Sequence, residues 1–195
     1  MNAGLILAAG ESRRMGRPKA LLEYRGETFV DRLIGLFARY CSPVVVVLGA
    51  QQASVRAGIR RSAAALLVEN PEFRLGQLTS MQCGLRAIPA EAEGVLFTLV
   101  DHPAVEPETI ASLLAAGAPA PLRIPRSGGR RGHPIWFSHS LIAEFLGLPA
   151  WSSAREVVTR HAVEIAYVEV DDPGILADID DPEGYRRLLG ERGAA

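Results

Sequence analysis

Residues 7–19 read LAAGESRRMGRPK and follow directly on the apolar run of residues 5–7 near the N-terminus. The loop begins with three small residues: Ala8, Ala9 and Gly10. Small residues let the backbone approach a ligand closely, and free N–H groups in such a loop can hold phosphate oxygens. Four cations follow: Arg13, Arg14, Arg17 and Lys19. The segment predicts an anion-binding turn after the first strand of an α/β fold, and the alternative is a solvated basic turn.

Two familiar nucleotide-binding loops are excluded here. No Gly-Lys-Ser/Thr follows at the offset that a P-loop requires, and the GxGxxG pattern of dinucleotide-binding folds is absent. The chain has 21 Lys and Arg against 22 Asp and Glu, which gives a net charge of −1. It therefore lacks the positive field with which proteins bind nucleic acid by bulk electrostatics. Any bound anion must be held locally, and nucleic acid is not an expected partner.

Apolar runs alternate with segments of helical period beyond this loop. The strongest run is residues 44–48, where four consecutive valines suit a strand buried on both faces. Further strands are predicted at 65–68, 95–100 and 163–170, and helices at 30–37 and 78–88 and after Pro107 and Pro182. Residues 118–132, rich in Pro, Gly and Arg, are predicted to be an irregular excursion. The pattern predicts a three-layer α/β fold, with a mostly parallel sheet flanked by helices.

Length and composition limit the remaining classes. A chain of 195 residues is about one domain, so a single domain over residues 1–195 is expected. Cys41 and Cys83 form neither a disulfide framework nor a zinc motif, which fits a reducing compartment. The apolar runs are too short for a signal segment or a membrane span. A soluble, cytoplasmic protein without a membrane partner is expected.

Polar residues stand at the predicted element ends. Asp101 follows the apolar strand 95–100, at the edge where open α/β sheets bind ligands, and a carboxylate there is costly unless it meets a cation. Asn70, Gly76, Thr79 and Ser80 lie around a predicted helix start, where hydroxyls and unpaired N–H groups can approach a ligand. A simple helix cap explains these residues equally well.

Three later segments carry chemistry. Arg130 and Arg131 precede Gly132-His133-Pro134, which suits either a basic acceptor loop or a hairpin-like turn. Arg155 follows two serines at a predicted helix start, where a phosphate could bind. Near the end, Asp178 and Asp180 would face one side of an extended segment, while Asp181 is the expected N-cap of the helix at Pro182.

Taken in order, these segments resemble the MobA-like nucleotidyltransferases, which have a GT-A-like Rossmann fold, and within them the molybdenum cofactor cytidylyltransferase group. The resemblance runs along almost the whole chain. Guanylyltransferase relatives usually carry a second glycine where this chain has Ala9, and Gly132-His133-Pro134 is typical of the cytidylyltransferase group. Asp101-His102-Pro103 keeps the family's Asp and Pro, but His102 replaces the usual glutamine or methionine. We interpret His102 as a variant with a structural or peripheral role.

The resemblance implies the nucleotide-diphospho-sugar transferase fold and a set of site residues. The implied catalytic residues are Lys19, Arg14 and Asp101. The implied nucleotide-binding residues are Leu7, Ala8, Ala9, Gly10, Ser12, Arg14, Lys19, Asn70, Gly76, Thr79 and Ser80. The acceptor would meet Gly132, His133, Pro134 and Arg155. A magnesium ion, Mg²⁺, would bind Asp101 with help from Asp178 or Asp180.

The function implied by the resemblance is Mg²⁺-dependent cytidylyl transfer. CTP and molybdopterin would be the substrates, pyrophosphate would be released, and a molybdoenzyme would be the protein that accepts the product. Three alternatives stay open: transfer to a sugar or polyol phosphate, a GTP-dependent molybdopterin guanylyltransferase, and a non-enzymatic chaperone that inserts nucleotide or cofactor.

Overall fold

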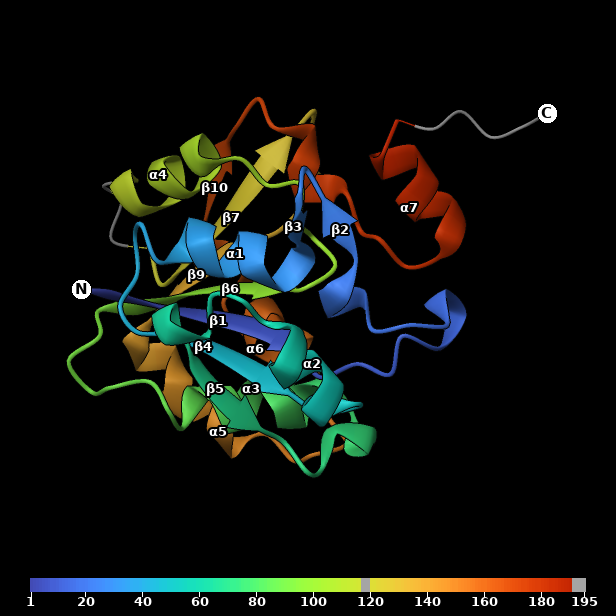
Figure 1. The fold of residues 1–195 in the computed structure, drawn as a ribbon. Helices are drawn as coiled ribbons and strands as arrows, with labels where there is room; N and C mark the ends of the chain where they lie inside the picture. Colours follow the sequence, from blue (N-terminus) through green and yellow to red (C-terminus); the bar gives the residue numbers. More distant parts are fainter. Residues whose placement is uncertain (117–119, 191–195) are drawn as a thin grey trace.

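The computed structural model describes residues 1–116 and 120–190. Its centre is an eight-stranded sheet of order β10-β7-β9-β6-β1-β4-β5, in which β8 pairs with β7 (Figure 1). The strands are β1 (Asn2–Ala8), β4 (Val44–Leu48), β5 (Leu66–Glu69), β6 (Gly94–Leu99), β7 (Leu122–Ser127), β8 (Arg130–Arg131), β9 (Ile135–Ser138) and β10 (Ile165–Glu169). Strands β5, β4, β1 and β6 run parallel, as do β7 and β10, while β9 is antiparallel to both its neighbours. The predicted α/β fold with a mostly parallel sheet is confirmed.

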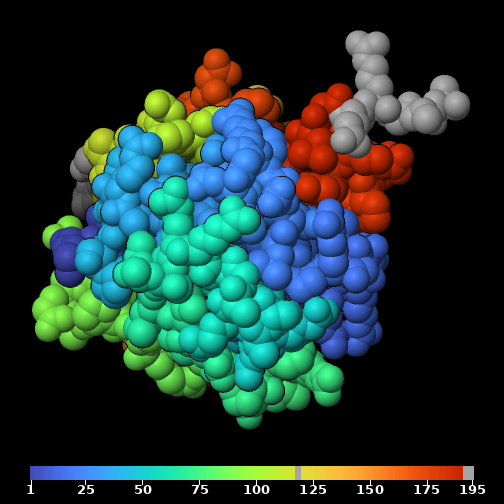
Figure 2. All heavy atoms as spheres, in the orientation of Figure 1, coloured from blue at the N-terminus to red at the C-terminus, as the bar shows by residue number. Residues whose placement is uncertain are grey.

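Helices cover both faces of this sheet. One face carries α1 (Phe29–Phe37), α2 (Gln52–Gly58) and α4 (Pro107–Ala115). The opposite face carries α3 (Gln77–Leu85), α5 (Ile142–Gly147) and α6 (Arg155–Arg160). The last helix, α7 (Pro182–Leu188), lies outside these layers beside the N-terminal loop and the small ribbon of β2 (Glu23–Tyr24) and β3 (Glu27–Thr28) (Figures 1 and 2).

Short 3-10 turns complete the chain at several loops. They are η1 (Arg13–Met15), η2 (Lys19–Leu21), η3 (Ser62–Ala64), η4 (Phe73–Leu75), η5 (His139–Leu141), η6 (Ala162–Glu164) and η7 (Pro173–Leu176). Within the residues that the structure describes, no helix is long and apolar enough to cross a membrane.

The central strands are apolar throughout because each side chain enters one of two cores. In β1, Ile6 and Ala8 face the α1 side, whereas Leu5 and Leu7 face the α3 side. The valines of β4 alternate in the same way, and the whole strand is buried. Each fully buried leucine or valine contributes about 1.5–3 kcal/mol relative to exposure. The prediction of a strand buried on both faces at residues 44–48 is confirmed.

Parallel pairing brings the loops after β1 and β6 to one edge of the sheet. Leu7 pairs with Leu99, and the Val100 N–H donates to the Leu7 carbonyl at 3.0 Å. The residues that follow, from Ala8 on one strand and Asp101 on the other, therefore leave the sheet side by side. This edge carries the candidate site.

The prediction of an irregular segment at 118–132 is wrong over its described part. Residues 122–127 form β7, in which Leu122, Ile124 and Pro125 are buried while the other three residues are partly exposed. The Pro and Arg content hides this strand in the sequence, and the Pro125 carbonyl accepts from the Gly132 N–H. Residues 118 and 119 lie outside the described part. Helices α2 and α5 were also absent from the sequence prediction.

Gly84→Ala should destabilise the fold, because α3 approaches β1 and β4 through this glycine. A Cβ at Gly84 would lie 2.4 Å from Leu5 Cδ1 and 2.7 Å from Val47 Cγ2. Overpacking of this kind costs about 1–3 kcal/mol, to be read as a lower free energy of unfolding in urea. The matched control is Gly147→Ala in α5, where nothing lies within 4 Å of the new Cβ. Equal effects of the two variants would contradict the close approach.

Candidate functional site

A cavity of about 360 Å³ opens at the carboxyl ends of β1 and β6. The expected nucleotide-binding residues that line it are Leu7, Ala8, Ala9, Gly10, Ser12, Lys19 and Ser80, together with the expected catalytic Asp101. Sequence reasoning missed several other lining residues, among them Arg74 and Gln77. Gln77 is the first residue of α3 and directly follows Gly76. Its position at a predicted helix start, next to an expected site residue, is the sequence signal that could have identified it.

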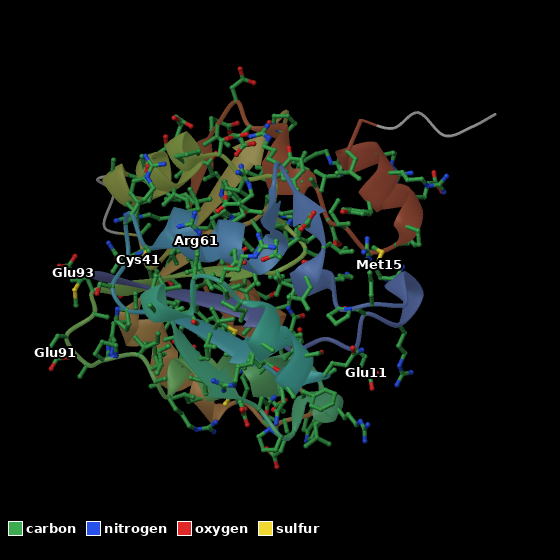
Figure 3. All side chains as sticks on the ribbon, in the orientation of Figure 1. Glu11, Met15, Cys41, Arg61, Glu91 and Glu93 are labelled. Carbon is green, nitrogen blue, oxygen red and sulfur yellow. The ribbon has the colours of Figure 1, made fainter. Side chains whose placement is uncertain are left out.

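The loop after β1 is held by its own hydrogen bonds. The Ser12 hydroxyl accepts from the Lys19 backbone N–H at 3.0 Å, which closes the seven-residue turn between them. Ser12 itself has a left-handed backbone with φ 52°. At the base of the loop the Ala50 N–H donates to the Ala9 carbonyl, and a Cβ on Gly49 would come within 2.7 Å of that oxygen. Figure 3 shows Glu11 and Met15 along this loop, with Met15 beside α7 and Glu11 farther from it.

The Lys19 ammonium is the centre of a charge network. Its Nζ donates to Asp180 Oδ1 at 2.6 Å and to Asp101 Oδ2 at 3.1 Å, and Arg14 Nη2 donates to Asp180 Oδ2 at 2.6 Å. Burial alone lowers the pKa of Lys19, but the hydrogen bond to Asp180 and the charge of Asp101 outweigh burial and raise it. The hydrogen bond from Lys19 lowers the pKa of Asp180. Lys19 and Asp180 are therefore both charged at neutral pH.

The acidic segment near the C-terminus is fixed to Asp101 through the backbone. The Ile179 N–H donates to the Asp101 carbonyl at 3.0 Å, and the Ile179 side chain is buried. Asp178 and Asp180 flank this anchor. The expected N-cap role of Asp181 is confirmed, because its side chain accepts from the Gly184 N–H at 2.8 Å.

Two histidines lie against each other beneath Asp101. The rings of His102 and His133 are 4.7 Å apart, and His102 Nε2 is 3.9 Å from Asp101 Oδ1. Burial lowers the pKa of both histidines to about 4, with Lys19 adding to the effect on His102. Both imidazoles are therefore neutral at pH 7. His102, interpreted from the sequence as having a structural or peripheral role, is buried beside Asp101 and does not line the cavity.

The residues present fit a divalent cation. Asp101, His102 and Asp178 each offer one ligand atom, and these atoms lie within 4.8 Å of one another. Asp101 Oδ1 is buried and has no hydrogen-bond partner among the described residues, as an oxygen that binds a cation would. Burial and the nearby charge of Asp101 raise the pKa of Asp178, which a cation would reverse. Asp180 lies instead on the two basic side chains.

Asn70 and Thr79 support the cavity wall from behind. The Asn70 amide donates to the hydroxyls of Thr79 and Ser80 at 3.0 and 2.9 Å, and its oxygen accepts from the Glu72 N–H. The Thr79 hydroxyl donates to the Gly76 carbonyl. Asn70 and Thr79 are buried, and of this group only Ser80 lines the cavity.

The expected acceptor residues separate into two places. The His133 N–H donates to the Ile175 carbonyl, and a Cβ on Gly132 would come within 2.2 Å of the same oxygen, so the triplet with Pro134 packs tightly beside Asp101. Arg155 is exposed at the start of α6. Among the described contacts, no hydrogen bond or ion pair joins its side chain to the cavity.

The match to known proteins settles the family. Residues 4–165 match the family described as MobA-like NTP transferase domain. This chain is a MobA-like NTP transferase. It is 27% identical to the molybdenum cofactor cytidylyltransferase of Escherichia coli, over 93% of this chain and 92% of that protein. It is 31% identical to the nicotine blue oxidoreductase of Paenarthrobacter nicotinovorans, over 95% of each chain.

A solved structure supports a divalent cation in the family. Rv0371C of Mycobacterium tuberculosis, crystallised in complex with manganese, is 27% identical and has a TM-score of 0.77, with 98% of this chain and 99% of that chain covered. The expected MobA-like family is confirmed by the match over residues 4–165.

Lowering the pH from 7 to 5 should destabilise the fold through the two buried histidines. Each has an ordinary pKa of 6.5 and a folded pKa of about 4, so between these values the unfolded chain binds more protons. Their stabilisation is complete above about pH 6.5 and is lost as the pH falls toward 4. Urea unfolding should show a loss of about 1–2 kcal/mol per histidine.

The matched variants for this measurement are His133→Gln and His139→Gln. His133→Gln removes one of the two buried groups and should roughly halve the loss, whereas His139→Gln, on η5, should keep it. An unchanged loss in His133→Gln would show that this ring is not the source.

Proposed function

We propose that this MobA-like NTP transferase transfers the cytidylyl group of CTP to the terminal phosphate of molybdopterin and releases pyrophosphate. The observation that carries the proposal is the Lys19 ammonium, held by Asp101 and Asp180 at the wall of a cavity whose floor is the small-residue loop. Basic side chains that could bind phosphates and carboxylates that could bind a divalent cation lie together at this place. The named activity of the Escherichia coli relative supports the choice of substrates.

The proposed reaction depends more on the positioning of the two substrates than on proton transfer. An acceptor phosphate is already ionised at pH 7, so it can attack the α-phosphorus of the nucleotide without a general base. A new bond forms between the acceptor oxygen and the α-phosphorus, and the bond to the bridging oxygen of pyrophosphate breaks, with that oxygen taking the electron pair. In-line placement of the two reactants can supply much of the rate enhancement.

The residues of this chain would divide the work as follows. Ala8, Ala9 and Gly10 would lie against base and sugar, and Ser80 would offer its hydroxyl from the cavity wall. Lys19 and Arg14 would leave Asp180 for the phosphates and stabilise the charge that develops on pyrophosphate.

A divalent cation such as Mg²⁺ would be held by Asp101 and Asp178, because Asp180 is paired with Lys19 and Arg14. The cation would supply further charge neutralisation at the phosphates. Gly132, His133 and Pro134 would form the acceptor side, with Arg155 as a phosphate contact. A molybdoenzyme is the proposed acceptor of the product.

Pyrophosphate release tests the substrates directly. The protein is incubated with Mg²⁺, each of the four nucleoside triphosphates, and either molybdopterin or simple sugar phosphates. Only CTP with molybdopterin should give rapid release. A preference for GTP would contradict the cytidylyl assignment, turnover of a sugar phosphate would contradict the acceptor, and no release with any pair would contradict nucleotidyl transfer.

Lys19→Met should lower kcat by about 10²–10³-fold, because one buried cation that faces the developing charge is lost. The matched control is Arg13→Met in the same loop, whose side chain is 82% exposed and pairs with Glu11. This control removes one positive charge from the loop without touching the cavity, and its kcat should change less than about 3-fold. Equal losses in the two variants would mean that the loop acts only through its overall charge.

A further inference from the structure

Three potential ligands of different kinds meet at the end of β6. They are a partly buried carboxylate on Asp101, a buried imidazole on His102 and an exposed carboxylate on Asp178, and one atom of each lies within 4.8 Å of the others. The His102 side chain is 8% exposed. A cation that reached this position would meet one nitrogen and two oxygen donors.

The polar atoms of this cluster are poorly satisfied. Asp101 Oδ1 and His102 Nδ1 are both buried and have no hydrogen-bond partner among the residues described. Leaving such an atom unpaired is energetically unfavourable, so buried polar atoms of this kind call for an explanation. The other oxygen of Asp101 is already bonded to Lys19. The unpaired oxygen, Oδ1, is therefore the one that lies 3.9 Å from His102 Nε2.

The imidazole of His102 is held in place by the segment beside it. The His133 ring lies at 4.7 Å from the His102 ring, with an angle of 33° between the two planes. His133 is in turn fixed by its N–H bond to the Ile175 carbonyl and by the ring of Phe97 at 5.7 Å. The His102 ring therefore packs against a neighbouring ring, and within residues 1–116 and 120–190 its Nδ1 has no hydrogen-bond partner, which leaves a ring nitrogen available to bind a metal.

We propose that His102 is a nitrogen ligand of the divalent-cation site and makes that site bind Mn²⁺ more tightly than Mg²⁺. Magnesium prefers oxygen ligands in a near-ideal octahedron, whereas first-row transition ions bind imidazole readily and Mn²⁺ also binds carboxylates. A glutamine here would offer an oxygen and remove the discrimination. The inference deepens the proposed function, on which it rests for the use of a cation, by identifying the residue that selects the ion.

Binding to the nucleotide-free full chain tests this without any turnover. The protein is stripped with a chelator and titrated with Mn²⁺, and free Mn²⁺ is followed by electron paramagnetic resonance. Mg²⁺ is then added as a competitor. The wild type should need at least about tenfold more Mg²⁺ than Mn²⁺ for half displacement. Equal competition by the two ions would overturn the proposal.

Three variants locate the effect. His102→Gln should weaken Mn²⁺ binding by about 10–100-fold and change Mg²⁺ binding by less than about 3-fold. His139→Gln is the matched control at the opposite end of the sheet, where its N–H bonds to the Glu93 carbonyl, and it should bind both ions as the wild type does. Asp101→Asn should weaken both ions. Unchanged Mn²⁺ binding in His102→Gln, or unchanged binding of both ions in Asp101→Asn, would overturn the proposal.

A spectroscopic readout on the wild type covers the case in which His102→Gln does not fold. Electron spin echo modulation of bound Mn²⁺ should show coupling to an imidazole nitrogen, and its absence would overturn the proposal. Failure of the transfer assay alone would leave these results intact, because neither experiment contains a nucleotide or an acceptor. The two proposals can therefore fail separately.

Discussion

The Lys19 ammonium holds the site together because it joins segments that are far apart in sequence. Its two carboxylate partners, Asp101 and Asp180, are 82 and 161 residues away. Half-buried charges of one sign are costly, so neither the lysine nor the two carboxylates could occupy this place alone. The pairing fixes the loop after β1, the end of β6 and the segment before α7 in one arrangement. A chain with a net charge of −1 thereby concentrates opposed charges at one edge of its sheet.

The same pairing separates two aspartates that look equivalent in the sequence. Asp180 accepts from Lys19 and Arg14, and the hydrogen bond from Lys19 lowers its pKa. Asp178, two residues earlier, is left beside Asp101, so its pKa is raised by burial and by like charge. A triphosphate would compete with Asp180 for the two cations, whereas a divalent cation would relieve the repulsion at Asp178. Substrate and cation thus act on different carboxylates of one short segment.

Local pattern predicted the features that depend on local physics. Buried parallel strands are apolar without a break, so residues 44–48 could be recognised, and the small residues of the loop, predicted to allow close approach of a ligand, line the cavity. Features that depend on distant partners could not be predicted. The direction in which Asn70 donates is set by Thr79 and Ser80, and the place of the His102 ring is set by the ring of His133. Strand β7 was hidden because it contains two arginines and a buried proline, which interrupt the apolar pattern of a strand.

The two sides of the site are built in different ways, and this difference explains why the acceptor is the harder substrate to identify. The loop after β1 and the start of α3 line the cavity, and the small and basic residues of the loop suit the proposed contact with a triphosphate. On the other side, backbone touches backbone: Gly132 meets the Ile175 carbonyl, and Gly174 meets the Ala104 carbonyl. The buried Asp172 carboxylate ties these turns together by accepting from the Glu106 and Gly174 N–H groups. These backbone contacts fix the path of the chain but do not fix which side chains the turns expose. The side chains that would determine acceptor specificity are therefore not constrained by this packing.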